Sequence, residues 1–455
     1  MVDGPVRPGD QQRRTGEPTP RHPGLLTAEQ LIRIDRFDRA AVQRRTLITL
    51  CVSAIFGRAG MTAAFAVAAL LVKEIFDAET WAGVASAAFT VGTAVSSAAL
   101  SGYMARRGRR PGLSIGFVAA VAGGGLAVLG GQLALDGTRL LIALYLAGLV
   151  GIGVGQGANN LARYAATDLA DEDKRGRSIS LVVFASSIGA IGGPLLIGPA
   201  GRLGESVGLQ ELVGPYLLSI AFFAFGSLVL WLGLRPDPLV VAGGLDADAT
   251  VDQRSSFADG WAALAASPLS RLAVVGLVVS QAVMVMVMAM TPLHMDAHGH
   301  GLDAVGWVIS VHTAGMFAFA PLAGWSADRF GRIPTLATGA VLLIVSTIMT
   351  ALAGEAPAIL MFPGLFLLGL GWAFGMVAAS ALVAESVEPS SSVAAQGAAD
   401  LITAFVSGAG ALASGFVFSM AGFHILSMLG ILAAGVLLVL VFYRHQVDTR
   451  LAAAR

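Results

Sequence analysis

Cysteine and charge are both scarce in this sequence of 455 residues. The single cysteine, Cys51, has no partner for a disulfide within the chain. Only 13% of the residues are charged whereas 55% are hydrophobic, and one core cannot bury that much apolar surface. These absences exclude an internal disulfide and a water-soluble globule, and they indicate a membrane protein.

Motifs for catalysis or cofactor binding are missing as well. The glycine-rich run from Gly151 to Gly157 lacks the G-x-G-x-x-G spacing of a dinucleotide loop, and no strand precedes it. Glycines in this pattern favour close helix packing instead. No metal-hydrolase spacing and no Ser/His/Asp set lies at a membrane face, so we expect no enzyme, no cofactor and no nucleic-acid partner.

Long apolar runs are what the chain does contain, and most reach the roughly 20 residues that a helix needs to cross a bilayer. They lie near residues 46–72, 81–104, 112–134, 139–163, 178–200, 213–234, 272–293, 303–326, 334–353, 358–384, 396–420 and 423–443. We predict an all-α membrane protein of twelve transmembrane helices, in two pseudo-symmetric six-helix halves around a central cavity. The predicted parts are a disordered and amphipathic N-terminal segment (1–45), the first half (46–234), a cytoplasmic linker (235–271), the second half (272–443) and a cytoplasmic tail (444–455).

The charges are unevenly distributed along the chain although they sum to zero. If the N-terminus is cytoplasmic, and its nine arginines are left out, sixteen Lys and Arg residues fall inside. Only Lys73, Arg139 and Arg202 then fall outside. The positive-inside rule therefore predicts that both termini are cytoplasmic.

A charged turn occurs twice, half a chain apart. Residues 322–339 and 100–116 share a pattern at offsets of 222 and 223, in which Gly108 and Arg109 match Gly331 and Arg332. Around span 5, Ser186 and Gly189 match Ser407 and Gly410 at an offset of 221. Two matches at nearly one offset indicate a duplicated transporter.

This turn resembles the loop between helices 2 and 3, and 8 and 9, of the major facilitator superfamily, roughly G-x-L-A-D-R-x-G-R. The second copy fits at Gly324, Asp328, Arg329, Gly331 and Arg332, and the first copy has Gly102, Arg106, Arg107, Gly108 and Arg109 but no Asp. The resemblance implies a monomeric secondary transporter in the cell membrane, which moves a small molecule or metal ion, in some members with protons. It also implies that these charges act in gating, whereas a simpler role is to fix the topology.

Span 5 contains Gly189, Gly193 and Pro194, in a pattern that resembles the G-x-x-x-G-P motif of superfamily antiporters. Proline removes a backbone hydrogen bond and glycine permits close contact, which suits a helix that bends during alternating access. The motif favours proton-coupled export of a drug or metabolite. A kinked packing helix is equally compatible with it.

Polar residues within the spans are few, and burying them in lipid is costly. We expect them to face the central cavity or one another. They are Arg58, Gln156, Asn159, Asn160, Gln281, His312 and Asp400.

Spans 7 and 8 carry a methionine and histidine pattern. Met284 and Met288 share one helix face, and His312 and Met316 are again four residues apart. Thioethers and an imidazole form a soft site suited to Cu(I), although methionine alone is usually core packing. The outer loop adds His294, His298 and His300, which could gather metal at the entrance.

M-x-x-x-M in span 7 and H-x-x-x-M in span 8 resemble motifs of the bacterial CcoA-like copper importers. The resemblance implies copper import. Two points leave other substrates open: those importers use functional thiols whereas this chain has only Cys51, and related members carry organic substrates such as riboflavin. The alternatives are a proton-coupled efflux antiporter and a membrane sensor that does not transport.

Overall fold

The computed structural model describes residues 39–138, 141–171, 174–243, 257–353, 360–388 and 392–453. The predicted disordered and amphipathic N-terminal segment (1–45) lies outside the described residues as far as position 38. From Arg39 onward the chain already belongs to the first long helix. The N-terminal segment therefore ends earlier than predicted.

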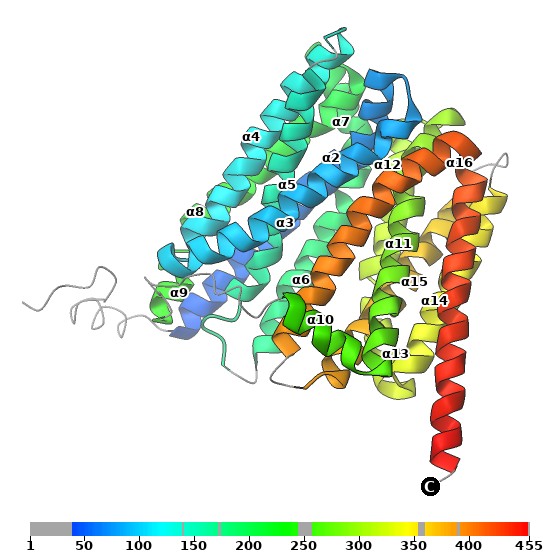
Figure 1. Ribbon diagram of the computed structural model, residues 1–455. Coiled ribbons are helices and arrows are strands. Elements are labelled where there is room, and N and C mark those ends of the chain that lie inside the picture. Colours follow the sequence, from blue (N-terminus) through cyan, green and yellow to red (C-terminus); the bar gives the residue numbers. More distant parts are fainter. Residues whose placement is uncertain are drawn as a thin grey trace, which may run out of the picture.

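The described chain is built from long helices, because a helix satisfies its own backbone hydrogen bonds in a lipid environment. The first half contains α2 (Arg39–Phe76), α3 (Ala82–Arg107), α4 (Arg109–Leu135), α5 (Ile142–Ala165), α6 (Arg175–Gly192), α7 (Ile197–Ser206) and α8 (Gly214–Gly233). The second half contains α11 (Pro268–Ala297), α12 (Leu302–Phe317), α13 (Ala320–Phe330), α14 (Arg332–Leu352), α15 (Met361–Ser386) and α16 (Ser392–Ala453). The two halves lie side by side in Figure 1.

The predicted all-α membrane fold is confirmed. Eleven helical segments in the described residues are long and apolar enough to cross a membrane. The last of them bends at Gly422, whose φ of 75° is not helical, and so contains two spans. With that division the described helices account for all twelve predicted runs.

Several boundaries differ from the predicted ones. The linker contains two short helices, α9 (Pro238–Val241) and α10 (Phe257–Ala266), and α11 begins within it at Pro268. At the other end, α16 continues into the predicted tail as far as Ala453. An apolar run in the sequence ends where the side chains become polar, whereas a helix continues until its backbone geometry changes.

Spans 5 and 8 are each interrupted. In span 5, α6 ends at Gly192 and Pro194 opens a 3-10 turn, η4 (Pro194–Leu196), before α7 begins. Proline has no N–H to donate, so the regular helix cannot pass through it unchanged. In span 8, α12 ends at Phe317 and α13 starts at Ala320, with a proline in its first turn.

The duplicated turns have matching geometry. Gly108 joins α3 to α4 with a φ of 99°, and Gly331 joins α13 to α14 with a φ of 97°. Only glycine adopts this conformation without strain. The repeat therefore preserves a tight turn as well as a set of charges.

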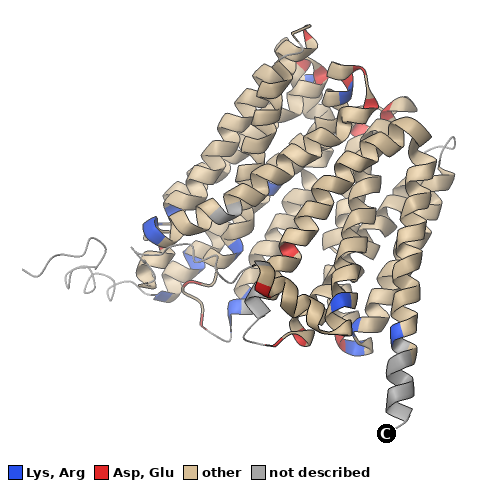
Figure 2. Ribbon diagram, in the orientation of Figure 1, with Lys and Arg blue, Asp and Glu red and all other residues tan. Residues whose placement is uncertain are grey.

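The bundle has two chemically different ends (Figure 2). Lys and Arg gather at the end that carries the α3–α4 and α13–α14 turns, which we call the basic end. Asp and Glu dominate the opposite end, which carries the α2–α3 and α11–α12 turns and which we call the acidic end.

The halves are joined at the acidic end. Lys73 pairs with Asp296 at 2.9 Å, and Arg202 pairs with Asp303 at 2.8 Å, each pair linking the first half to the second. Helix backbones also meet there without room for a side chain, at Gly306 against the Pro194 carbonyl. The acidic end is therefore closed in this structure.

Candidate substrate cavity

A cavity of about 520 Å³ lies between the two halves. Its walls come from α2, α3, α5 and α6 on one side and from α11, α12, α15 and α16 on the other. A second cavity of about 560 Å³ shares Phe65, Gln156 and Gln281 with it. The second cavity extends to Tyr164 and Asp400, near the basic ends of α5 and α16.

The methionine and histidine side chains singled out in spans 7 and 8 all line the first cavity: Met284, Met288, His312 and Met316. The imidazole of His312 is only 2% exposed. Its Nδ1 lies 2.9 Å from the Leu365 carbonyl, which can only accept, so Nδ1 carries the hydrogen. Nε2 then presents a lone pair and has no protein partner.

Gln281 connects three helices at the wall of this cavity. Its Nε2 donates to the Ser407 hydroxyl at 2.7 Å, and its Oε1 accepts from the Trp372 indole at 2.8 Å. Both ends of the amide are therefore satisfied, and they hold the Trp372 ring in place. The ring of Phe317 meets Trp372 at an angle of 68°.

Arg58 lies midway along α2 and lines the first cavity. Its Nη2 donates to the Asn160 side-chain oxygen at 3.4 Å. The Gln156 carboxamide is also within reach, 2.6 Å from Nη1 when its oxygen faces the guanidinium. These partners are neutral amides, so they accept hydrogen bonds without neutralising the charge.

Two other polar residues lie nearby. Asn159 is 3% exposed, and neither of its amide atoms has a protein partner. Asp400 is exposed toward the second cavity, of which Arg163 is another wall residue. The predicted polar residues thus line the cavities between the helices or lie beside them, with Asp400 toward the basic end.

The duplicated turns lie at the basic end, outside the cavity. Arg332 pairs with Asp328 at 2.7 Å and with Glu385 at 2.9 Å. In the first copy, Arg109 makes two bonds to Asp168, at 2.9 and 3.0 Å.

The first copy also gains a carboxylate from outside its motif. Asp237 accepts from the Arg110 backbone N–H at 2.7 Å, at the start of α4. Arg106, by contrast, donates back to the Gly102 carbonyl of its own helix. The turn of the first copy therefore has acidic neighbours, Asp168 and Asp237, although its motif lacks the Asp.

Sequence reasoning missed several of these partners. Asp168 and Glu385 lie at or just beyond the ends of α5 and α15, each the second helix after its turn. This shared position was a signal available in the sequence. Trp372 was a second signal in the sequence, because an indole N–H within a membrane span needs a hydrogen-bond acceptor.

The predicted metal-gathering loop has little support. His294 is buried and stacked on Phe423, with the His298 ring 4.3 Å away. Within the part of the chain that the structure describes, no group of three or more His, Cys, Asp or Glu side chains could hold a metal ion. Methionine is not among those four residue types, so this absence does not concern the methionine and histidine set of spans 7 and 8.

Comparison with solved structures places this architecture among known transporters. A bacterial homologue of the iron transporter ferroportin, in an inward-facing state, superimposes with a TM-score of 0.68 at 13% identity, covering 88% of this chain and 98% of the other. A bacterial homologue of the human lysosomal transporter Spinster gives a TM-score of 0.66 at 15% identity, covering 88% and 95%. At such identities the likeness concerns the fold.

Sequence relatives are closer. The uncharacterized MFS-type transporter YddS of Bacillus subtilis is 33% identical over 90% of this chain and 92% of its own, and YdeG of the same organism is 34% identical over 86% and 89%. The riboflavin transporter RfnT of Brucella anthropi is 27% identical over 80% and 86%. The family model described as Major Facilitator Superfamily matches residues 50–305 and 272–454. The chain therefore belongs to the major facilitator superfamily and is a membrane transporter rather than an enzyme.

Proposed function

We propose that this transporter carries a small organic solute through the central cavity by alternating access. The observation that carries the proposal is the cavity of about 520 Å³ with walls from both halves. Cavities of roughly 300–1,000 Å³ are typical of small-molecule sites, and a single metal ion fills only a small part of one.

The chemistry of the walls supports an organic solute. Phe65, Phe317 and Trp372 offer apolar and aromatic surface, while Gln156 and Gln281 offer amide groups. A few polar groups in an apolar wall orient a small molecule and give specificity. The riboflavin transporter RfnT, a relative by sequence, is named for a solute of this general kind.

The proposed orientation follows from charge. We assign the basic end to the cytoplasm because of the positive-inside rule. With the acidic end closed, this conformation then faces inward. Export in exchange for protons is the direction favoured by the Gly189–Pro194 motif, with Asp400 as the proton carrier because it is the carboxylate that lines the second cavity.

The test uses the full-length protein in proteoliposomes loaded with a bacterial metabolite extract, with riboflavin as the first defined probe. Mass spectrometry would identify compounds that exchange across the membrane. We expect at least one organic compound to exchange, and Trp372→Ala to slow that exchange at least tenfold. Trp325→Ala is the matched control, since Trp325 is exposed on α13 and is not part of the cavity lining. If no organic compound exchanges, the proposal is wrong.

Copper import is the second candidate function, favoured by the unpartnered His312 Nε2 in the cavity that Met288 and Met316 also line. Cu(I) would be the transported substrate, and an imidazole lone pair and thioether sulfurs are ligands that it accepts.

For this candidate we expect His312→Ala and Met288→Ala each to abolish copper accumulation by cells at matched membrane abundance. Met286→Ala should leave copper accumulation intact, because Met286 lies against Gly410 of α16 and outside the cavity lining. Equal effects at positions 286 and 288, or no copper uptake with the wild-type protein, would exclude copper.

A further inference from the structure

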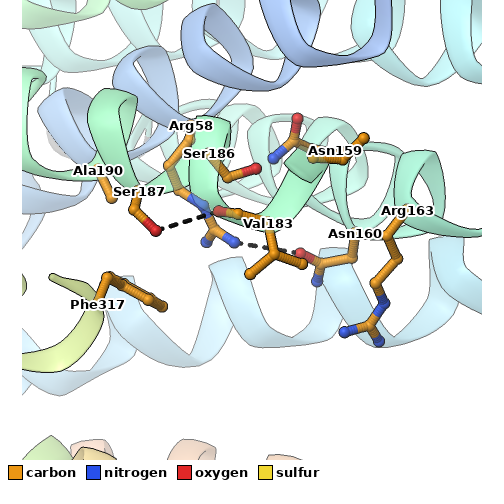
Figure 3. Close-up of a pocket in the computed structure, with 10 residues that line it drawn as sticks. Arg58, Asn159, Asn160, Arg163, Val183, Ser186, Ser187, Ala190 and Phe317 are labelled. Carbon is orange, nitrogen blue, oxygen red and sulfur yellow. Dashed lines mark hydrogen bonds between the residues drawn. The ribbon is translucent and has the colours of Figure 1, made fainter. Parts of the chain in front are cut away.

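A small pocket beside the central cavity contains two guanidinium groups (Figure 3). Its volume is about 140 Å³, too small for a whole organic solute and large enough for one acidic group. Its polar lining consists of Arg58 from α2, Asn159, Asn160 and Arg163 from α5, and Ser186 and Ser187 from α6.

No short ion pair of the described residues neutralises the positive charge in this pocket, although Asp400, which lines the second cavity together with Arg163, attracts that guanidinium. Among the residues that the structure describes, none of the ion pairs within 4.0 Å involves Arg58 or Arg163. No acidic residue lines the pocket. The Nε atoms of both arginines are buried without a hydrogen-bond partner.

The contacts that these arginines do make are neutral. Arg58 has the amides of Gln156 and Asn160, and Arg163 donates to the Tyr164 hydroxyl at 3.2 Å and lies over that ring. Like charges in a poorly hydrated pocket destabilise each other, and an unpaired charge inside a membrane is costly. An anion bound between the two arginines would offset both their mutual repulsion and the cost of an unpaired charge inside the membrane.

Asn159 adds an independent observation. It is almost fully buried in the wall of this pocket, yet both its amide nitrogen and its amide oxygen are without a partner. Buried polar groups in native proteins are nearly always paired, so an unpaired amide points to a ligand or water. Its N–H₂ group can donate to an anionic oxygen.

The pocket adjoins the central cavity, because Arg58, Asn160, Ala190 and Phe317 line both. We propose that the transported solute is an organic anion whose carboxylate, sulfonate or phosphate group binds between Arg58 and Arg163. The body of the solute then lies in the central cavity against Phe317 and Trp372. This inference rests on the proposed function and names the class of its substrate.

The test compares small aromatic probes that differ in charge, of which benzoate and benzamide are isosteric. Benzoate, benzenesulfonate and phenyl phosphate are titrated against the purified full-length protein, with benzamide as the neutral probe, and tryptophan fluorescence follows thermal unfolding. We expect the best anion to bind at least tenfold more tightly than benzamide. Arg58→Gln and Arg163→Gln should each remove that preference. Arg271 is an exposed cation at the start of α11, so the Arg271→Gln variant should retain the preference.

Arg58→Lys keeps the charge and covers the case in which Arg58→Gln does not fold. It should retain a preference for anions, which a purely structural role for the guanidinium would not explain. Binding of all three anions no tighter than that of benzamide, or a preference for anions that survives both glutamine variants, would overturn the inference.

Transport separates this inference from the proposed function. A neutral solute that exchanges at the same rate in the wild type and in Arg58→Gln would overturn the anion inference and leave the proposed function intact. Arginine-dependent binding of benzoate with no organic compound exchanged would support the anion site while the proposed transport function fails.

Discussion

Arg109 and Arg332 occupy matching places in the two turns, yet their ion pairs differ in burial. The side chains of Arg109 and Asp168 are 18% and 7% exposed, whereas Asp328 is 78% exposed. A two-bond guanidinium–carboxylate contact is stronger than a single one, and removing one partner of a buried pair leaves an uncompensated charge. The first pair should therefore contribute more to stability than the second.

We expect Asp168→Asn to lower the free energy of unfolding by about 2–4 kcal/mol, because Arg109 would lose its charged partner in a mostly buried place. The measurement is unfolding of the purified protein in a series of denaturing detergent mixtures. A loss well below this range would mean that water or another carboxylate replaces Asp168.

Asp328→Asn is the matched comparison at the second turn. Because its carboxylate is exposed, we expect stability near that of the wild type, and slower solute exchange if the Asp328–Arg332 contact acts in gating. Unchanged exchange would reduce Asp328 to a determinant of topology. An equal loss of stability at positions 168 and 328 would contradict the difference in burial.

Sequence alone could predict part of this residue-scale picture. Helical spacing places Met284 and Met288 on one face, and in the structure both line the cavity. It could not identify Asp168 as the partner of Arg109 or Gln281 as the partner of Trp372, because 59 and 91 residues separate them. Such pairs depend on how distant helices pack, which local spacing does not encode.

At the scale of helices, small residues decide how closely the two halves meet. A side chain on Gly83 of α3 would collide with the backbone of Ala411 in α16, and one on Gly306 of α12 would collide with the Pro194 carbonyl of η4. Glycine lets membrane helices approach until their backbones touch. These two contacts join the halves at the acidic end.

We expect Gly306→Val to prevent closure at the acidic end, since its side chain would occupy the space of the Pro194 carbonyl. The measurement is the distance between spin labels at positions 205 and 298, on a background with Cys51→Ser. That distance should increase in the variant. Gly301→Val is the control, because nothing lies within 4 Å of a Cβ at Gly301, and it should leave the distance unchanged.

Hydropathy predicted the existence of the spans better than their interruptions. The apolar run of span 8 is continuous in sequence, yet α12 ends at Phe317 and α13 begins at Ala320. A proline in the run was visible, but whether it kinks a helix or opens a new one depends on its neighbours. The cavity-facing end of α12 is therefore a tertiary feature that the run could not define.

For the whole molecule, the ion pairs and glycine contacts describe one conformation. The acidic end is held shut by Lys73–Asp296 and Arg202–Asp303, while the second cavity reaches Tyr164 and Asp400 toward the basic end. The duplicated halves can exchange this arrangement for its opposite by rocking about the cavity. The side of the membrane to which the cavity opens then depends on the topology.

We expect the basic end to be cytoplasmic, because Lys and Arg near short loops are retained on that side during insertion. Figure 2 shows the cations gathered at the basic end, and Lys73 and Arg202 are the cations of the acidic end among the described residues. The measurement uses reporter fusions at Arg455, at Asp248 and in the α11–α12 turn at Gly299. Green fluorescent protein should be fluorescent at the first two positions, and alkaline phosphatase should be active only at the third. Phosphatase activity at Arg455 would reverse the assignment, and the conformation closed at the acidic end would then face outward.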